Sequence, residues 1–130
     1  VLIGSILSSQ TICVLARNLK KLPKLKRLDL RLNKQFDDAS FVEVTQSASS
    51  CKSLVDLRLS LYRVSLKGYD DVTRCIERDQ EGWKRLKKLF LLHGSPTEEF
   101  VIFLSKVMKY LKHAKVFSIS ALNSSDDLSR

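Results

Sequence analysis

The chain has 130 residues, of which 44% are hydrophobic and 28% charged, and its formal net charge at pH 7 is +9. Four glycines and two prolines are too few for a fibrous or low-complexity protein, and the apolar fraction is too high for a disordered one. No stretch approaches the roughly 20 consecutive apolar residues of a membrane-spanning helix. The composition therefore predicts one folded domain with a continuous core.

A short apolar phrase recurs along the chain: an apolar residue, two others, an apolar residue, one other, and a third apolar residue. Its four copies are Leu25-Leu28-Leu30, Leu54-Leu57-Leu59, Leu86-Leu89-Leu91 and Ala114-Phe117-Ile119. They begin 29, 32 and 28 residues apart, which is typical of stacked supersecondary units. Each phrase predicts a short strand, and Val1 and Ile3 predict an earlier one. The expected strands span 1–3, 28–32, 57–61, 89–92 and 117–120.

Apolar residues upstream of each phrase predict one helix per unit. They lie thirteen, ten, six and three residues before the phrase, and spacings of three, four and three mark one face of a helix. In the longest repeat Val72 is one place out of step and Gln80 breaks the column six residues before the phrase. The helices are expected at 8–21, 38–51, 70–79 and 96–111, with a bulging loop at 79–82 in the longest repeat. The residues expected to face the strands are Ile12, Leu15, Leu19, Leu22, Phe41, Val44, Ala48, Cys51, Val72, Ile76, Trp83, Val101, Leu104, Met108 and Leu111.

The phrase Leu-x-x-Leu-x-Leu, preceded each time by a helix, resembles the ribonuclease-inhibitor-like leucine-rich repeats. Cys51, in Cys-x-x-Leu-x-x-Leu-x-Leu, is similar to a cysteine of some members. The resemblance covers residues 1–123 and implies an α/β solenoid, a curved horseshoe of about four and a half repeats with parallel strands on its concave side. The residue after the strand is Asn only at Asn33, so a regular asparagine ladder is not expected.

The last residues, Ser124-Ser125-Asp126-Asp127, are typical of a helix start, so residues 124–130 are expected to begin a further repeat or form a tail. Neither end has a polar capping unit, which favours a portion of a longer solenoid. Cys13, Cys51 and Cys75 lack Cys-x-x-Cys spacing and fit buried thiols better than disulfides or zinc ligands. We therefore expect an intracellular, cytoplasmic setting.

Acidic residues gather where the helices begin, and basic residues gather where helices end and strands begin. Because all units point the same way, the basic residues should form one rim. This basic rim comprises Lys24, Lys26, Arg27, Lys84, Lys87, Lys88, Lys112 and Lys115. The helix dipole explains the sign of the rim. It does not explain an excess of nine positive charges, which favours an acidic partner surface or a nucleic-acid backbone.

Residues between the strand leucines should line the concave face in three columns. The columns are Arg27, Asp56, Lys88, Val116; Asp29, Arg58, Phe90, Ser118; and Arg31, Ser60, Leu92, Ser120. Cross-strand ion pairs are expected for Arg27–Asp56, Asp56–Lys88 and Asp29–Arg58. The alternative is that these residues only keep like charges apart.

Phe90 and Leu92 would place an apolar pair on this polar face, which is the make-up of an interface hot spot. The alternative is that the irregular run 89–92 turns one of them into the core. The residues expected to contact a partner are Arg31, Arg58, Lys88, Phe90, Leu92 and His93.

Enzyme signatures are absent from the sequence. His93 and His113 lie in different repeats, and there is no His-x-x-x-His, Gly-rich phosphate loop or Gly-x-Ser-x-Gly. We expect no catalysis, metal or cofactor, and a protein–protein interaction module that uses the concave face and the basic rim. Two alternatives stay open: RNA or polyanion binding through the rim, and a purely structural segment of a large assembly.

Overall fold

The computed structural model describes residues 2–5 and 7–120 as alternating parallel strands and helices. The strands are β1 (Leu2–Ser5), β2 (Arg27–Leu32), β3 (Asp56–Ser60), β4 (Lys88–His93) and β5 (Lys115–Ser120). The α-helices are α1 (Ser9–Arg17), α2 (Asp38–Ser50), α3 (Leu66–Arg78), α4 (Gln80–Trp83) and α5 (Glu98–Val107). Short 3₁₀ helices, η1 (Leu19–Lys21) and η2 (Met108–Tyr110), continue α1 and α5.

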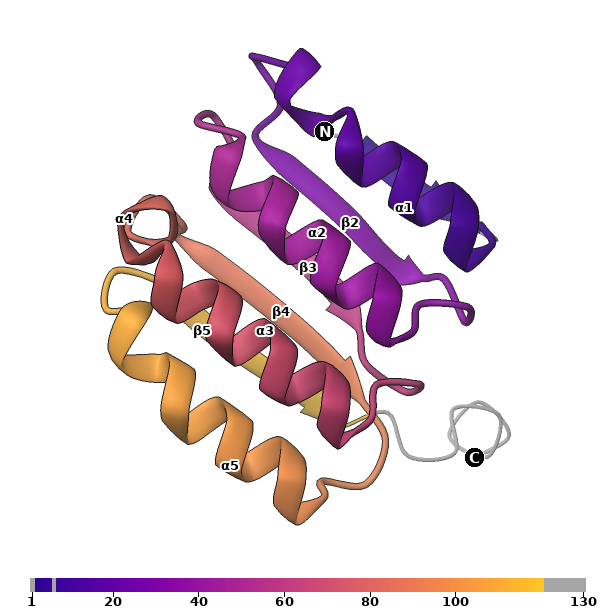
Figure 1. Cartoon of the computed structure of the whole chain (residues 1–130), viewed down its shortest axis with the longest axis vertical. Coiled ribbons are helices and arrows are strands. Elements are labelled where there is room, and N and C mark those ends of the chain that lie inside the picture. Colours follow the sequence, from indigo (N-terminus) through magenta and orange to yellow (C-terminus); the bar gives the residue numbers. More distant parts are fainter. Residues whose placement is uncertain (1, 6, 121–130) are drawn as a thin grey trace.

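The strands form one sheet in chain order, β1-β2-β3-β4-β5, and each pair is parallel. Figure 1 shows α1, α2, α3 and α5 side by side over one face of this sheet, each packed on the next. This is the repeating α/β arrangement that the recurring phrase predicts. The curvature of a complete horseshoe stays a prediction, as does the division at residue 123, because residues 124–130 lie outside the described part.

The opposite face of the sheet carries no helix within the described part of the chain (Figure 1), and we call it the open face. Alternation along β2–β5 places twelve residues on it. These are Arg27, Asp29, Arg31, Asp56, Arg58, Ser60, Lys88, Phe90, Leu92, Lys115, Phe117 and Ile119.

The core lies between the helices and the sheet. Leu28, Leu57 and Leu89 pair in register across β2, β3 and β4, and all three are buried. Above them the helices bury one apolar stripe each, which includes Val44 of α2 and Ile76 of α3. The three cysteines are buried free thiols, and burial raises the pKa of Cys13, the largest of several effects on it. Strand and helix therefore share a single continuous apolar layer.

The longest repeat differs from expectation at both ends of its helix. α3 begins at Leu66 rather than residue 70, with Ser65 at the N-cap position, and its first turns bury Tyr69. Residues 79–82, expected to form a loop, instead enter the short helix α4, whose Gly82 N–H is capped by the Asp79 side chain at 3.2 Å. The extra residues of this repeat are thus accommodated as one additional helical turn.

The fourth repeat is shifted by one residue from the expected register. Leu89 pairs with Val116 and Leu91 with Ser118, so Phe117 and Ile119 turn to the open face, where they are 39% and 41% exposed. The helix shifts in step: α5 buries Phe100, Phe103 and Val107. The expected core positions Val101, Met108, Phe117 and Ile119 are therefore wrong. A slip of one residue moves every side chain of a strand to the other face. Leu22, after η1, is also exposed rather than buried.

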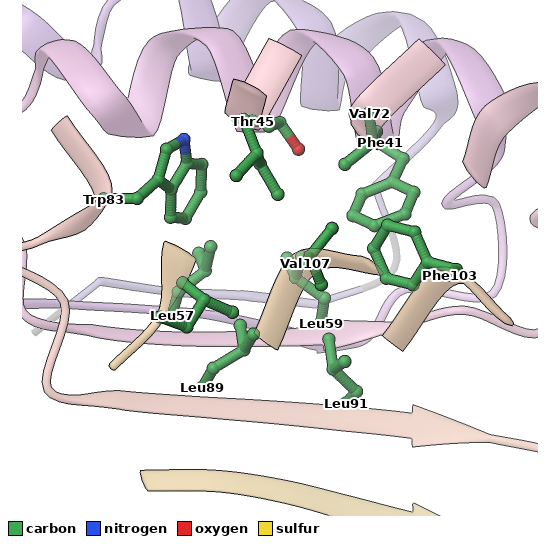
Figure 2. A pocket seen from close by; sticks show the side chains of 12 residues that line it. Phe41, Thr45, Leu57, Leu59, Val72, Trp83, Leu89, Leu91, Phe103 and Val107 are labelled. Atoms are coloured by element: carbon green, nitrogen blue, oxygen red, sulfur yellow. The ribbon is translucent and has the colours of Figure 1, made fainter. Parts of the chain in front are cut away.

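Trp83 and Cys51 are buried, as expected from their column in the repeat. In Figure 2 the Trp83 ring lies above Leu57 and Leu89, beside a small void between the helices and the sheet. The void measures about 20 Å³ and is lined almost wholly by apolar side chains. Trp83 is thus one of the large side chains that fill the space between the helices and the sheet.

Replacing Trp83 with alanine should lower the free energy of unfolding by about 3–5 kcal/mol, because a large cavity would join the existing void. Since repeats are stabilised by their neighbours, the loss should uncouple the two halves of the sheet and broaden the transition. Urea denaturation followed by circular dichroism measures both effects. Leu22→Ala, at an exposed apolar position, is the matched control and should cost less than ~1 kcal/mol. An equal loss in the two variants would contradict the packing.

The register of β5 can be tested with two lysine substitutions. Ile119→Lys places a charge on the open face and should change the unfolding temperature little. Leu91→Lys places the same charge in the core and should prevent stable folding. Thermal unfolding by circular dichroism distinguishes them. If Ile119→Lys were as damaging as Leu91→Lys, the expected core position of Ile119 would be right after all.

Candidate binding surface on the open face

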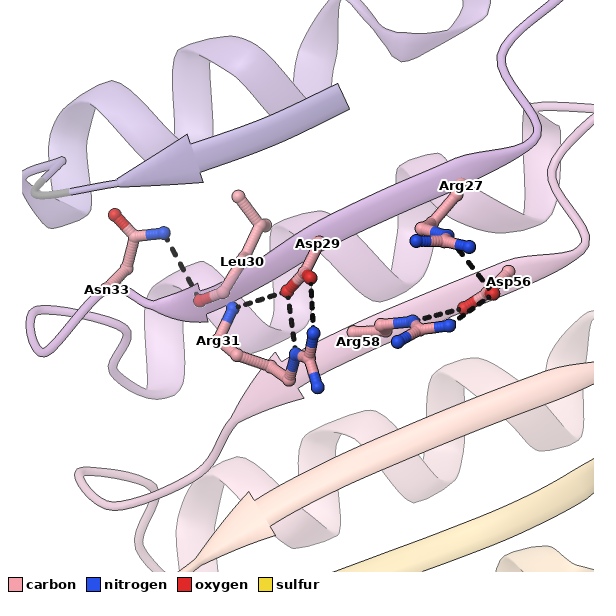
Figure 3. A network of polar contacts seen from close by, with 7 residues as sticks. All are labelled: Arg27, Asp29, Leu30, Arg31, Asn33, Asp56 and Arg58. Carbon is pink, nitrogen blue, oxygen red and sulfur yellow. Dashed lines mark hydrogen bonds and ion pairs between the residues drawn. The ribbon is translucent and has the colours of Figure 1, made fainter. Parts of the chain in front are cut away.

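The β2 side of the open face carries a salt bridge within one strand (Figure 3). Asp29 and Arg31 are two residues apart and therefore share a face. Arg31 Nε donates to Asp29 Oδ1 at 2.9 Å and Arg31 Nη2 to Oδ2 at 2.7 Å, while the Arg31 backbone N–H donates to Oδ1 at 3.1 Å. This two-pronged pairing fixes both side chains in one orientation.

A second salt bridge of the same form lies on β3. Arg58 Nε and Nη2 donate to the two oxygens of Asp56 at 2.9 and 3.0 Å. Arg27 of β2 reaches the same carboxylate from the neighbouring strand, with 3.4 Å between Nε and Oδ2. The expected Arg27–Asp56 pair is therefore confirmed.

The other two expected ion pairs, Asp56–Lys88 and Asp29–Arg58, do not form among the described residues. The reason is geometric. Each aspartate is held by the arginine two residues along its own strand, whose Nε and Nη2 bind both carboxylate oxygens. Arg58 contributes only longer-range attraction to Asp29.

Titration of this half of the face follows from these contacts. Burial alone would raise the pKa of Asp29, but the hydrogen bonds and positive charge of Arg31, aided by Arg58, outweigh it and hold that pKa below its usual value. The hydrogen bond to Asp56 likewise raises the pKa of Arg58 above its already high value, against the effect of burial. Asp29 is therefore ionised and Arg58 protonated at neutral pH.

An aromatic stack occupies the middle row of the other half, with Arg58, Phe90 and Phe117 in register across β3, β4 and β5. The Arg58 guanidinium carbon lies 4.0 Å from the centre of the Phe90 ring, a cation–π distance. On its other side, Phe90 stacks on Phe117 with ring centres 4.4 Å apart and an angle of 11° between the planes. Phe90 is thus held between a cation and a second ring.

Leu92 pairs with Ile119 in the next row, directly beside the stack. Phe90 and Leu92 are partly buried, and the core positions are taken by Leu89 and Leu91. The alternative in which Phe90 or Leu92 turns into the core is therefore wrong. Together Phe90, Leu92, Phe117 and Ile119 make a continuous apolar patch on β4 and β5, which we call the apolar patch.

His93, expected to contact a partner, faces the helices instead and is only 5% exposed. Its ring lies 4.3 Å from that of Phe100. Its Nδ1 is 2.7 Å from the Gly94 carbonyl oxygen and its Nε2 is 2.7 Å from Ser118 Oγ. β4 extends one residue beyond the expected end, so alternation places His93 with Leu89 and Leu91. His93 is a structural residue that ties β4 to β5.

The basic rim lies where expected, at the ends of helices and the starts of strands. Seven of its eight members are exposed, and Arg27 is partly buried. Lys84 is paired with Glu81 at 2.7 Å and Arg27 with Asp56, while the remaining six form no ion pair within the described ranges. Lys84 and Lys112 also line a surface hollow of about 200 Å³, together with Gln80, Lys109, Tyr110 and His113.

Phe117 and Ile119 are the members of this surface that sequence reasoning missed. The sequence pattern that could have placed them is the apolar stripe Phe100-Phe103-Val107. This stripe is the buried side of α5, the helix before β5, and it agrees with the observed register of β5. The binding role of the expected residues Arg31, Arg58, Lys88, Phe90 and Leu92 stays a prediction.

No group of three or more His, Cys, Asp or Glu residues placed to hold a metal ion occurs in the part of the chain that the structure describes. Over the same residues, no helix is both long and apolar enough to cross a membrane.

Comparison with known proteins gives a structural likeness only. No protein-family model and no curated protein match the chain. Among solved structures, the one titled "Leiomodin-1 Actin-Binding Site 2 (ABS2)" is similar, with a TM-score of 0.67 and 14% identity over 98% of this chain and 75% of that one. At this identity the likeness supports a leucine-rich-repeat-like fold, while membership of the superfamily stays a prediction.

Replacing Asp29 with Asn should lower the free energy of unfolding at pH 7 by about 1–3 kcal/mol, because Arg31 loses a charged partner. The folded-state pKa of Asp29 is lowered, so its contribution is complete above the unfolded value of about 3.9 and is lost as pH falls through the folded value. The gap between wild type and variant should therefore close below about pH 4. Urea titrations between pH 2 and 7 measure it, with the exposed Asp70→Asn as control. A gap independent of pH would contradict the charged pairing.

Proposed function

We propose that the chain is a non-catalytic protein-binding module that contacts its partner through the open face. The observation that carries the proposal is the apolar patch beside Lys88 and Lys115. This patch combines aromatic and aliphatic side chains with neighbouring cations, and it lies on the face of the sheet opposite the core. That composition is typical of an interface hot spot.

The neighbouring salt bridges support this proposal by making the face rigid. Arg58 is held by Asp56 and in turn lies over Phe90, so the rings are oriented before any partner arrives. A surface ordered in advance loses less conformational entropy on association. In this proposal Arg31, Arg58 and Lys88 border the contact, and Phe90 and Leu92 lie within it.

The similar structure supports the class of function without naming the partner. Its title describes an actin-binding site, so a protein of this fold serves as a binding site for another protein. Folds of this kind carry many functions. The chemistry of the partner is therefore inferred from the surface residues of this chain and not from the fold. The basic rim favours a partner with an acidic surface.

Single-stranded nucleic acid is a second candidate ligand, favoured by one specific observation. Phe90 and Phe117 stand beside Lys88 and Lys115 on one face. Aromatic rings interleaved with cations are the usual platform for unpaired bases. The protein partner is preferred because Leu92 and Ile119 add aliphatic surface that bases do not need.

Phe90→Ala tests the proposal. We expect it to abolish capture of specific proteins when the tagged chain is purified from its own cells, and to weaken the purified complex by about 2 kcal/mol or more, since the stack loses its central ring. Quantitative mass spectrometry with and without nuclease, then calorimetry, measures both. Val101→Ala removes an exposed apolar group from α5, away from the open face, and should leave binding unchanged.

Nucleic-acid binding would give the opposite pattern. The captured material would then be sensitive to nuclease, affinity would fall steeply with salt, and Lys84→Glu, Lys87→Glu and Lys88→Glu combined would abolish it. That result would contradict the proposal.

A further inference from the structure

Two lysines on the open face stand directly opposite each other. Lys88 of β4 pairs in register with Lys115 of β5, and both are exposed. Neighbouring strands are only about 4.8 Å apart, and like charges at directly opposed positions destabilise a sheet. This arrangement needs a counter-charge.

The chain does not supply that counter-charge from its described residues. The row to which the lysines belong runs Arg27, Asp56, Lys88, Lys115 across β2–β5. Its one carboxylate, that of Asp56, is already held by Arg27 and by both prongs of Arg58. The row therefore ends in two adjacent, uncompensated cations.

The apolar patch begins in the very next row of the face. Phe117 lies two residues beyond Lys115 on the same strand, and Phe90 two beyond Lys88, which is about 7 Å along the strand. Side chains two apart in an extended peptide have the same spacing and point the same way. A bound segment could therefore place an anion between the lysines and an apolar side chain on the rings at once.

We propose that the β4–β5 half of the open face binds an acidic protein segment. A carboxylate of this segment lies between Lys88 and Lys115, and an aromatic or large aliphatic side chain two residues away packs on Phe117 and Ile119. The inference deepens the proposed function and rests on it. It assigns recognition to the β4–β5 half of the face, where the positive charges of Lys88 and Lys115 are not paired by a salt bridge among the described residues.

The test selects ligands from a displayed library of random twelve-residue peptides, panned on the intact chain. We expect enriched peptides to carry Asp or Glu two residues from an aromatic residue or Leu. The combined change Lys88→Gln and Lys115→Gln should then weaken the best peptide at least tenfold, measured by fluorescence anisotropy. The control, Lys106→Gln with Lys109→Gln, removes the same charge from the helical layer, outside the basic rim and the open face, and should stay within twofold.

Each alternative result overturns a defined part of the scheme. Peptides that lack acidic residues yet lose binding with Phe117→Ala would overturn the carboxylate site and leave the proposed function standing. The absence of any peptide dependent on Phe90 or Phe117 would overturn both. A labelled twelve-residue oligouridylate that binds more tightly than every peptide, and is lost in the Lys88 and Lys115 variant, would replace the protein segment by nucleic acid.

A measurement without ligand tests the premise itself. Lys115→Glu turns the opposed cations into an ion pair, so the unfolding temperature of the free chain should rise, whereas Lys112→Glu should leave it unchanged. An unchanged or lower temperature for Lys115→Glu would show that the two lysines do not repel each other and would overturn the inference.

Discussion

The register of the parallel sheet is the constraint on which the rest of this molecule depends. Each strand alternates between a leucine-lined side under the helices and an open side, so one residue of slip would exchange the two. The helices decide the outcome, because their apolar stripes must meet the strand leucines. In the fourth repeat α5 buries Phe100, Phe103 and Val107, and β5 follows that choice even though it turns Phe117 and Ile119 outward.

This register gives the open face two unlike halves. On β2 and β3, two aspartates and three arginines are joined by close salt bridges and leave little charge unmatched. On β4 and β5 the same rows continue as opposed lysines and stacked rings. Arg58 joins the halves, since it holds Asp56 with its prongs and covers Phe90 with its plane. The salt bridge on β3 thus also fixes the position of the cation that lies over the Phe90 ring.

Sequence periodicity was enough to predict most of the fold. The phrase spacing located the parallel strands β2–β5 and the layer of helices, and the upstream column placed Trp83 and Cys51 in the core. It failed in the fourth repeat because Phe117 and Ile119 are more apolar than Val116 and Ser118, so hydrophobicity alone favours the wrong face. His93 was assigned to the wrong face because β4 continues one residue beyond the predicted end of the strand. Asp29 was assigned the wrong partner because Arg31, two residues along the same strand, holds both of its carboxylate oxygens. The pairing of Asp29 depends on a side-chain contact that alternation does not encode.

The slipped register also separates folding from function at β5. Phe117 and Ile119 contribute little to the core, so the stability of the described array does not account for large apolar groups at these positions. Smaller polar residues would satisfy the same backbone pairing and would cost less in exposed apolar surface. Their stacking on Phe90 and pairing with Leu92 makes the exposure continuous rather than scattered. A continuous apolar surface bordered by uncompensated cations is explained by a partner that covers it, not by the fold that carries it.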